Sequence, residues 1–85
     1  MTLEQLKKAS KVTGLKQVTK AINKNQVSSI LLGTDADGRV AEPLKILCRD
    51  KEIPVETVFT MAELGKACSI HVGAAAVAIL KQGHR

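Results

Sequence analysis

Aromatic residues are almost missing from this 85-residue chain, which has one phenylalanine, Phe59, and no tyrosine or tryptophan. Modules that stack unpaired bases on exposed rings, such as the RRM and the OB-fold, need several aromatic residues on one surface. The sequence therefore excludes that way of binding nucleic acid. If the chain binds RNA or DNA, it must use charge, backbone shape and polar side chains.

Cysteines and long apolar runs are also scarce. Cys48 and Cys68 are too few and too far apart for a disulfide framework or a zinc site, so we expect reduced thiols in a cytoplasmic protein. The longest weakly polar run, residues 70–80, contains His71 and Gly73 and is much shorter than the ~20 residues of a membrane-spanning helix. No charged segment followed by an apolar stretch opens the chain, so we expect no secretory signal.

The residues that are present have the balance of a soluble globular protein. Hydrophobic residues make up 45% of the chain and charged residues 25%, which supplies enough apolar surface to offset chain entropy. For this length we expect one domain, residues 1–85.

The net charge of +5 is concentrated in the first quarter of the sequence. Residues 1–24 contain six lysines and one acidic residue, Glu4, whereas the basic and acidic side chains of the remainder cancel. This asymmetry indicates an anionic partner that docks at one end of the chain. A solvated lysine-rich face that serves only solubility is the alternative, and charge alone does not decide between them.

Apolar periodicity and punctuating residues predict helices and strands that alternate with short connections. Thr60 and Glu63 form a capping box, Thr13 is a suitable N-cap, and Pro43 is expected in the first turn of its helix. Pro54 indicates an edge strand. Helices are expected over residues 2–10, 14–24, 41–50 and 61–68, and strands over residues 11–13, 27–33, 53–58 and 75–80. This order favours an α/β sandwich with a small, largely buried sheet between helical layers.

The helix expected over residues 14–24 has one basic face. At about 100° per residue, Lys16, Lys20, Lys24 and Gln17 fall within one stripe, opposite the apolar residues of the same helix. Gly14 lacks a Cβ in the first turn, so another molecule can approach the free N–H groups there, which favour anions. Gln17 can donate and accept hydrogen bonds, as base edges require. An ordinary exposed face is the alternative; it explains the lysines but not the glycine.

The stretch GLKQVTKAI, residues 14–22, resembles the G-x-N-E-x-x-K-A-I/V signature of the L-seven-Ae family of ribosomal proteins, which bind kink-turns. The resemblance continues through the segments ILLGTDAD, PLKILCRDKEIPV and ELGKACSI. It ends in IHVGAAAVAIL, which is similar to the family's I/L-x-V-P/G-x-A-A loop and final strand. The motifs keep the family's order and spacing over nearly the whole chain.

The resemblance implies a three-layer α-β-α sandwich with a four-stranded mixed sheet. It also implies binding to kink-turns, in which a bulge beside tandem sheared G·A pairs bends an RNA duplex sharply. By this match Gly14 permits close approach, Lys16 and Gln17 face guanine edges, and Lys20 and Lys24 meet guanine or phosphate. A second loop would cover the bulged nucleotides with apolar groups and backbone amides. Its residues are Ile70, His71, Val72, Gly73, Ala74 and Ala75.

Two positions depart from the common family pattern. Lys16 and Gln17 stand in place of the usual Asn-Glu pair, as in the bacterial branch of the family, so we expect altered base contacts and a steeper salt dependence. Gly73 stands where many members carry proline, which frees φ and predicts a loop that stays mobile until RNA orders it.

Other chemistry has little support in the sequence. The segment from Asp35 to Gly38 is similar to the start of a calcium loop, but its glycine comes too early and the bidentate glutamate is missing, so we expect no metal. The serines lack the context of a nucleophile elbow, and His71 and His84 have no partner at a useful spacing, so we expect neither an enzyme nor a cofactor.

The expected protein is therefore a cytoplasmic, monomeric RNA-binding domain that stabilises the bent conformer of a kink-turn. A protein–protein adaptor of a ribonucleoprotein, with only generic basic adhesion to RNA, is the alternative function. The sequence leaves the RNA itself open, because ribosomal RNA, a riboswitch or another non-coding RNA would all suit these residues.

Overall fold

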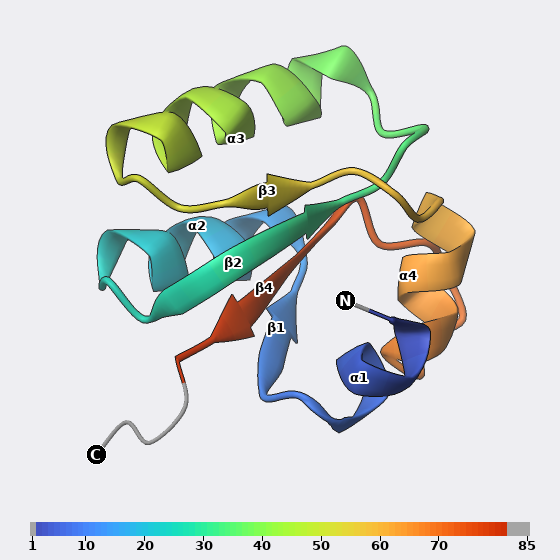
Figure 1. Ribbon diagram of the computed structural model, residues 1–85. Coiled ribbons are helices and arrows are strands. Elements are labelled where there is room, and N and C mark those ends of the chain that lie inside the picture. The colour runs from blue at the N-terminus through green and yellow to red at the C-terminus, as the bar shows by residue number, and fades with distance from the viewer. Residues whose placement is uncertain (1, 82–85) are drawn as a thin grey trace.

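The computed structural model describes residues 2–81, so that His84 lies outside the described residues. Within this range helices and strands alternate along the chain (Figure 1). The elements are α1 (Leu3–Lys8), β1 (Lys11–Thr13), α2 (Leu15–Asn23), β2 (Val27–Leu32), α3 (Gly38–Asp50), β3 (Val55–Glu56), α4 (Met61–Ala67) and β4 (Ala76–Leu80). None of the helices in residues 2–81 is long and apolar enough to cross a membrane.

The strands form one mixed sheet with the order β1-β4-β2-β3. β4 is antiparallel to both of its neighbours, whereas β2 and β3 run parallel. The implied four-stranded mixed sheet is thus confirmed, and β3 is the edge strand that Pro54 predicted. β3 is much shorter than expected because the chain leaves the sheet after Glu56 and carries Phe59 across to the other apolar core.

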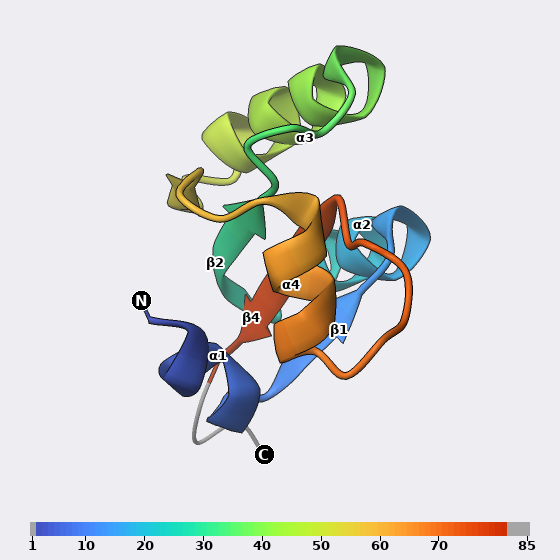
Figure 2. The same ribbon diagram turned by 90° about the vertical axis from the view of Figure 1, so that its right-hand side faces the viewer.

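Two apolar cores, one on each face of the sheet, define the three layers (Figures 1 and 2). In β2, Ile30 and Leu32 point toward α2 and α3, while Leu31 between them points toward α1 and α4, as the alternation of a strand requires. All three side chains are at most 2% exposed. Full burial of such a side chain stabilises a fold by about 1.5–3 kcal/mol. The helices are therefore held on both sides by one buried strand.

Local capping explains where the helices begin and corrects three expectations. The capping box of Thr60 and Glu63 starts α4 as predicted. α3 begins at Gly38 rather than at residue 41, because the Asp37 carboxylate accepts the Arg39 N–H at 2.8 Å. Pro43 consequently lies inside α3, where its missing N–H removes one helical hydrogen bond, and not in the first turn. The N-cap of α2 is Gly14 instead of the expected Thr13.

The strand register brings four connections to the same end of the sheet, which we call the loop end. Thr13 lies opposite Val77 and Leu32 opposite Ala76, so the chain leaves β1 and β2 where it enters β4. Gly33 donates to the Ala75 carbonyl at 2.8 Å. The loop end comprises residue 14 and residues 33–37, 57–60 and 70–75, and both α2 and α3 begin there.

Candidate nucleic-acid interface

The side chains of the basic face of α2 are arranged as the helical pattern predicts. Val18, Ala21 and Ile22 are buried against the sheet, at 6% exposure or less. The residues on the other side are all exposed, and we call them the α2 stripe. The stripe consists of Lys16, Gln17, Lys20 and Lys24. The structure therefore presents three ammonium groups and one amide to solvent from a single helix.

The α2 stripe borders a groove of about 190 Å³ between the helix and the end of β4. Gln17, Lys20 and Lys24 line it together with Gln26, a half-buried residue of the turn that follows α2. Sequence reasoning missed Gln26, because only the fold brings the turn beside the helix face. Polar and cationic groups around a groove of this size suit a phosphate-bearing strand.

Gly14 has the backbone conformation that only glycine adopts easily. Its φ is +87°, and it caps α2 without any side-chain hydrogen bond to the first amide groups. A Cβ placed on Gly14 would meet no atom within 4 Å, so the surface above this residue is open. The backbone at this position therefore requires glycine, and the absence of a side chain leaves open a helix N-terminus that favours anions.

The six residues of the predicted second loop divide into an inner and an outer set. Ile70 is half-buried and packs on the core beside α4, and Ala74 is only 4% exposed, so these two side chains form the inner set. His71, Val72 and Gly73 are exposed, and Val72 has 73% of its surface in solvent. We call these three residues the loop tip. Ala75 is intermediate in exposure.

The loop tip is carried on a base that is closely packed against α4. Ala74 donates to the Met61 carbonyl at 3.0 Å, and a Cβ on Gly73 would come within 3.2 Å of the Met61 Cβ. A Cβ on Gly65 would meet the Val72 carbonyl oxygen. Gly73 does not have a positive φ, so close packing rather than backbone freedom requires a small residue there. The expected mobility of this loop stays a prediction.

The six lysines of the first quarter do not form one surface. Lys7 and Lys8 belong to α1, which covers the sheet face opposite α2 (Figure 2). The Lys11 ammonium group donates to the carbonyl oxygens of Lys7 and Ala9 at 3.2 and 3.3 Å and so helps to satisfy the end of α1. The charge that faces a partner on the α2 side is therefore that of Lys16, Lys20 and Lys24.

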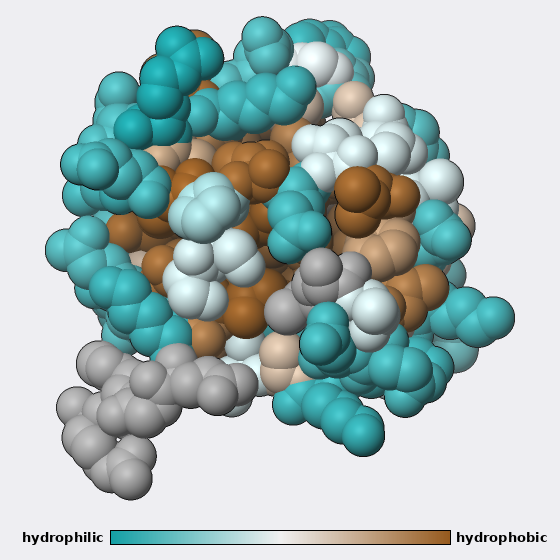
Figure 3. Space-filling model, viewed as in Figure 1, coloured by the Kyte–Doolittle hydropathy of each residue, from teal (hydrophilic) through white to brown (hydrophobic). Residues whose placement is uncertain are grey.

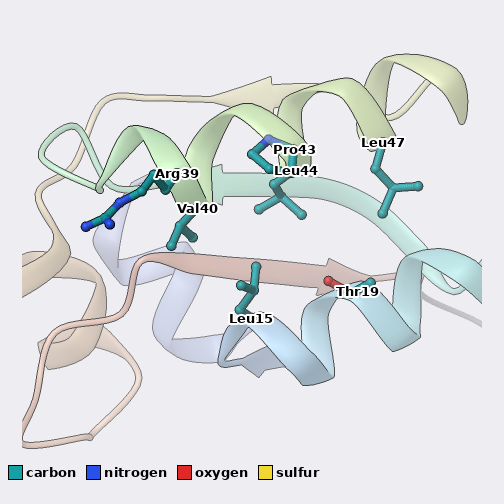
Figure 4. A pocket seen from close by; sticks show the side chains of 7 residues that line it. All are labelled: Leu15, Thr19, Arg39, Val40, Pro43, Leu44 and Leu47. Atoms are coloured by element: carbon teal, nitrogen blue, oxygen red, sulfur yellow. The ribbon is translucent and has the colours of Figure 1, made fainter.

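Arg39 is a further cation close to the loop end. The distribution of charge along the sequence did not predict it, because the charges after residue 24 cancel. Arg39 pairs with Asp37 at 3.1 Å, and this guanidinium holds the pKa of the Asp37 carboxyl below its usual range. Arg39 also shares with Leu15 the lining of an apolar groove of about 170 Å³ between α2 and α3 (Figure 4). The opposite side of the molecule, which faces the viewer in Figure 1, has apolar surface in its middle, rimmed by hydrophilic residues (Figure 3).

The two cysteines carry free thiols. Cys48 is buried in the α2–α3 core and Cys68 is partly buried near α4. Burial raises the pKa of both thiols, and the charge of Lys11 offsets part of this rise at Cys68. Neither sulfur lies in the surface described above, so we assign the cysteines to packing.

Comparison with known proteins places the chain in a family. The model of the ribosomal protein L7Ae/L30e/S12e/Gadd45 family matches residues 2–85. The chain is 38% identical over 82 residues to RNA-binding protein YbxF of Geobacillus stearothermophilus, covering 95% of this chain and 100% of that protein. It is 37% identical over 82 residues to an RNA-binding protein of Geobacillus thermodenitrificans, with the same coverage.

Two solved structures share the fold of this chain. A protein of unknown function from Bacillus halodurans superimposes with a TM-score of 0.83 at 28% identity, over 95% of this chain and 82% of that one. A 15.5 kD RNA-binding protein of Giardia lamblia has the same fold, with a TM-score of 0.83 at 24% identity, over 95% of this chain and 72% of that one. By its sequence over residues 2–85, the chain belongs to the ribosomal protein L7Ae/L30e/S12e/Gadd45 family.

Proposed function

We propose that this protein binds kink-turn RNA through the α2 stripe and the loop tip, and that it stabilises the bent conformer of that RNA. The observation that carries the proposal is the shared position of the two features. Gly14 and residues 70–75 lie at the same end of the sheet, so that a helix N-terminus, the stripe behind it and an exposed apolar tip are presented together there. Membership of the family and relatives named as RNA-binding proteins support an RNA partner.

Each part of this surface has a role that its chemistry suits. The open N-terminus of α2 at Gly14 receives the RNA closely, and the Gln17 amide hydrogen-bonds base edges. Lys20 and Lys24 contact phosphate along the groove, and Lys16 contacts guanine or phosphate. At the loop tip, Val72 offers an exposed apolar side chain to a bulged nucleotide. With no aromatic ring at the loop tip, contact with the bulged base depends on this aliphatic group and on backbone amides.

The mechanism is selection of the bent state from an ensemble of RNA conformers. The protein can shift this equilibrium only by its differential affinity for bent over extended RNA. To change the ratio of bent to extended RNA from about 1:99 to about 99:1, the protein must bind the bent conformer about 10⁴ times more tightly than the extended one. No chemical step is part of the proposal, and the protein acts as a cytoplasmic monomer on ribosomal RNA, a riboswitch or another non-coding RNA.

Fluorescence energy transfer across a kink-turn duplex, measured without magnesium, tests the proposal. Transfer should rise as protein is added, while a matched duplex without the G·A pairs should show no rise and should bind more weakly. Unchanged transfer at saturating protein would rule out the bending mechanism. Equal affinity for the two duplexes would favour the adaptor function with generic basic adhesion.

A further inference from the structure

The first turn of α3 brings an arginine to the proposed RNA surface. α3 begins at Gly38, directly after the part of the loop end formed by residues 33–37. Arg39 and Leu15, the first residue of α2, line the same groove. In Figure 4 the Arg39 side chain extends away from the body of α3, toward the end where α2 begins. The guanidinium therefore lies at the Gly14 end of the α2 stripe, on a different helix.

Asp37 orients the Arg39 side chain but engages only some of its hydrogen-bond donors. Its Nε and Nη2 atoms lie 3.4 and 3.1 Å from the two carboxylate oxygens of Asp37, which is a two-point contact. A guanidinium has five N–H donors, and this contact engages two of them. The side chain of Arg39 is 91% exposed, so the remaining donors face solvent.

Fold stability does not account for this arginine. Asp37 caps α3 through the backbone N–H of residue 39, which any residue other than proline would supply. The ion pair itself is exposed on both sides, and such pairs add very little to the free energy of unfolding. An arginine fixed by a neighbouring carboxylate, with a fork of free donors, instead suits the recognition of a phosphate group.

We propose that Arg39 binds a phosphate of the RNA strand that docks across the N-terminus of α2, and that Asp37 is a positioning residue that holds the guanidinium in place. The inference rests on the proposed function, since it extends the same surface onto α3. It makes the RNA site a two-helix site, in which α2 supplies the stripe and α3 supplies one fixed cation.

Arg49 provides a matched control, because it is an exposed arginine in the last turn of the same helix, at the opposite end from Arg39. Arg39→Ala and Arg49→Ala remove the same charge. We expect Arg39→Ala to weaken binding to a kink-turn duplex about tenfold, and to make the slope of log affinity against log salt shallower by about 0.7–0.9. Arg49→Ala should change neither quantity by comparison, and circular dichroism should confirm that both variants fold.

Two further variants separate position from charge. Arg39→Lys keeps the charge but not the fork, so it should retain the salt slope and lose part of the affinity. Asp37→Asn keeps a good N-cap but releases Arg39 and makes the protein more positive. Charge alone predicts tighter binding of Asp37→Asn to every RNA. The positioning role predicts tighter binding to plain duplex and about threefold weaker binding to the kink-turn, on the scale of one lost orienting contact.

The same titrations distinguish failure of this inference from failure of the proposed function. If the wild-type protein prefers the kink-turn but Arg39→Ala behaves like Arg49→Ala, the role of Arg39 is refuted and the function stands. If the wild-type protein binds both duplexes equally, the proposed function fails. The comparison of the two arginine variants on those duplexes then still decides whether Arg39 meets phosphate. Tighter binding of Asp37→Asn to the kink-turn would refute the positioning role.

Discussion

Replacement of Gly14 by alanine tests the claim that the start of α2 depends on a backbone conformation that other residues resist. With φ at +87° and ψ at 135°, Gly14 lies in a region that residues with a Cβ seldom enter. Holding such a residue there costs about 1–3 kcal/mol. Because a Cβ would meet no atom within 4 Å, the whole effect should come from the backbone and none from a clash. Taking about 2 kcal/mol, the Tm should fall by roughly 8–16 °C.

Gly38→Ala is the control for this experiment. Gly38 is the first residue of α3, has no positive φ, and also leaves open space for a Cβ. Alanine should therefore stabilise the protein at this position by about 0.4–1 kcal/mol, because it restricts the unfolded chain. Thermal and urea unfolding of both variants, followed by circular dichroism, would measure the difference. If Gly14→Ala proved as stable as Gly38→Ala, the reasoning from φ would be wrong.

Three further substitutions test the surface and its support. Gln17→Ala should lose about 1–3 kcal/mol of binding free energy on a kink-turn and little on plain duplex; similar losses on both RNAs in a fluorescence titration would show that Gln17 does not read bases. Lys20→Ala should make the salt slope shallower by about 0.7–0.9, whereas Lys66→Ala on α4 should not, and equal effects would indicate a diffuse field. Gly65→Ala should destabilise the fold by about 1–3 kcal/mol and weaken kink-turn binding, because its Cβ displaces Val72; unchanged urea unfolding would contradict this packing.

Local signals in the sequence were sufficient for the helices and for most of the strands. The capping box at Thr60 and the run from Ile30 to Leu32 act through neighbours in the chain, and both have the predicted structure. The amphipathic pattern of α2 likewise places the stripe correctly. Where prediction failed, a contact that the sequence pattern did not reveal competes, and it is local in the first case and long-range in the second. α3 starts early because Asp37 is free to cap it, and β3 is cut short because Phe59 is drawn to the opposite core.

Only some of the residues on the proposed RNA surface could be predicted from the sequence. Lysines in one helix can be placed by their spacing, but Lys11 is close to them in sequence and yet serves α1. Arg39 comes from the charge-neutral remainder and reaches the loop end through the register of β2 against β4. Lys81 comes from that remainder too, and its N–H donates to the Gln26 carbonyl beside the stripe. For that reason Lys66 is a better control than Lys81 for the Lys20→Ala variant.

The position of β4 in the sheet has a consequence for how the protein folds during synthesis. β4 lies between β1 and β2, although it is the last strand along the described chain. β1 therefore has no strand to pair with until roughly sixty further residues have been added, a non-local pairing of the kind that slows folding. A nascent chain that ends before Ala76 would leave the edges of β1 and β2 that pair with β4 exposed to other chains. Completion of the sheet, and with it the arrangement of the loop end, must wait for the ribosome to deliver residues 76–80.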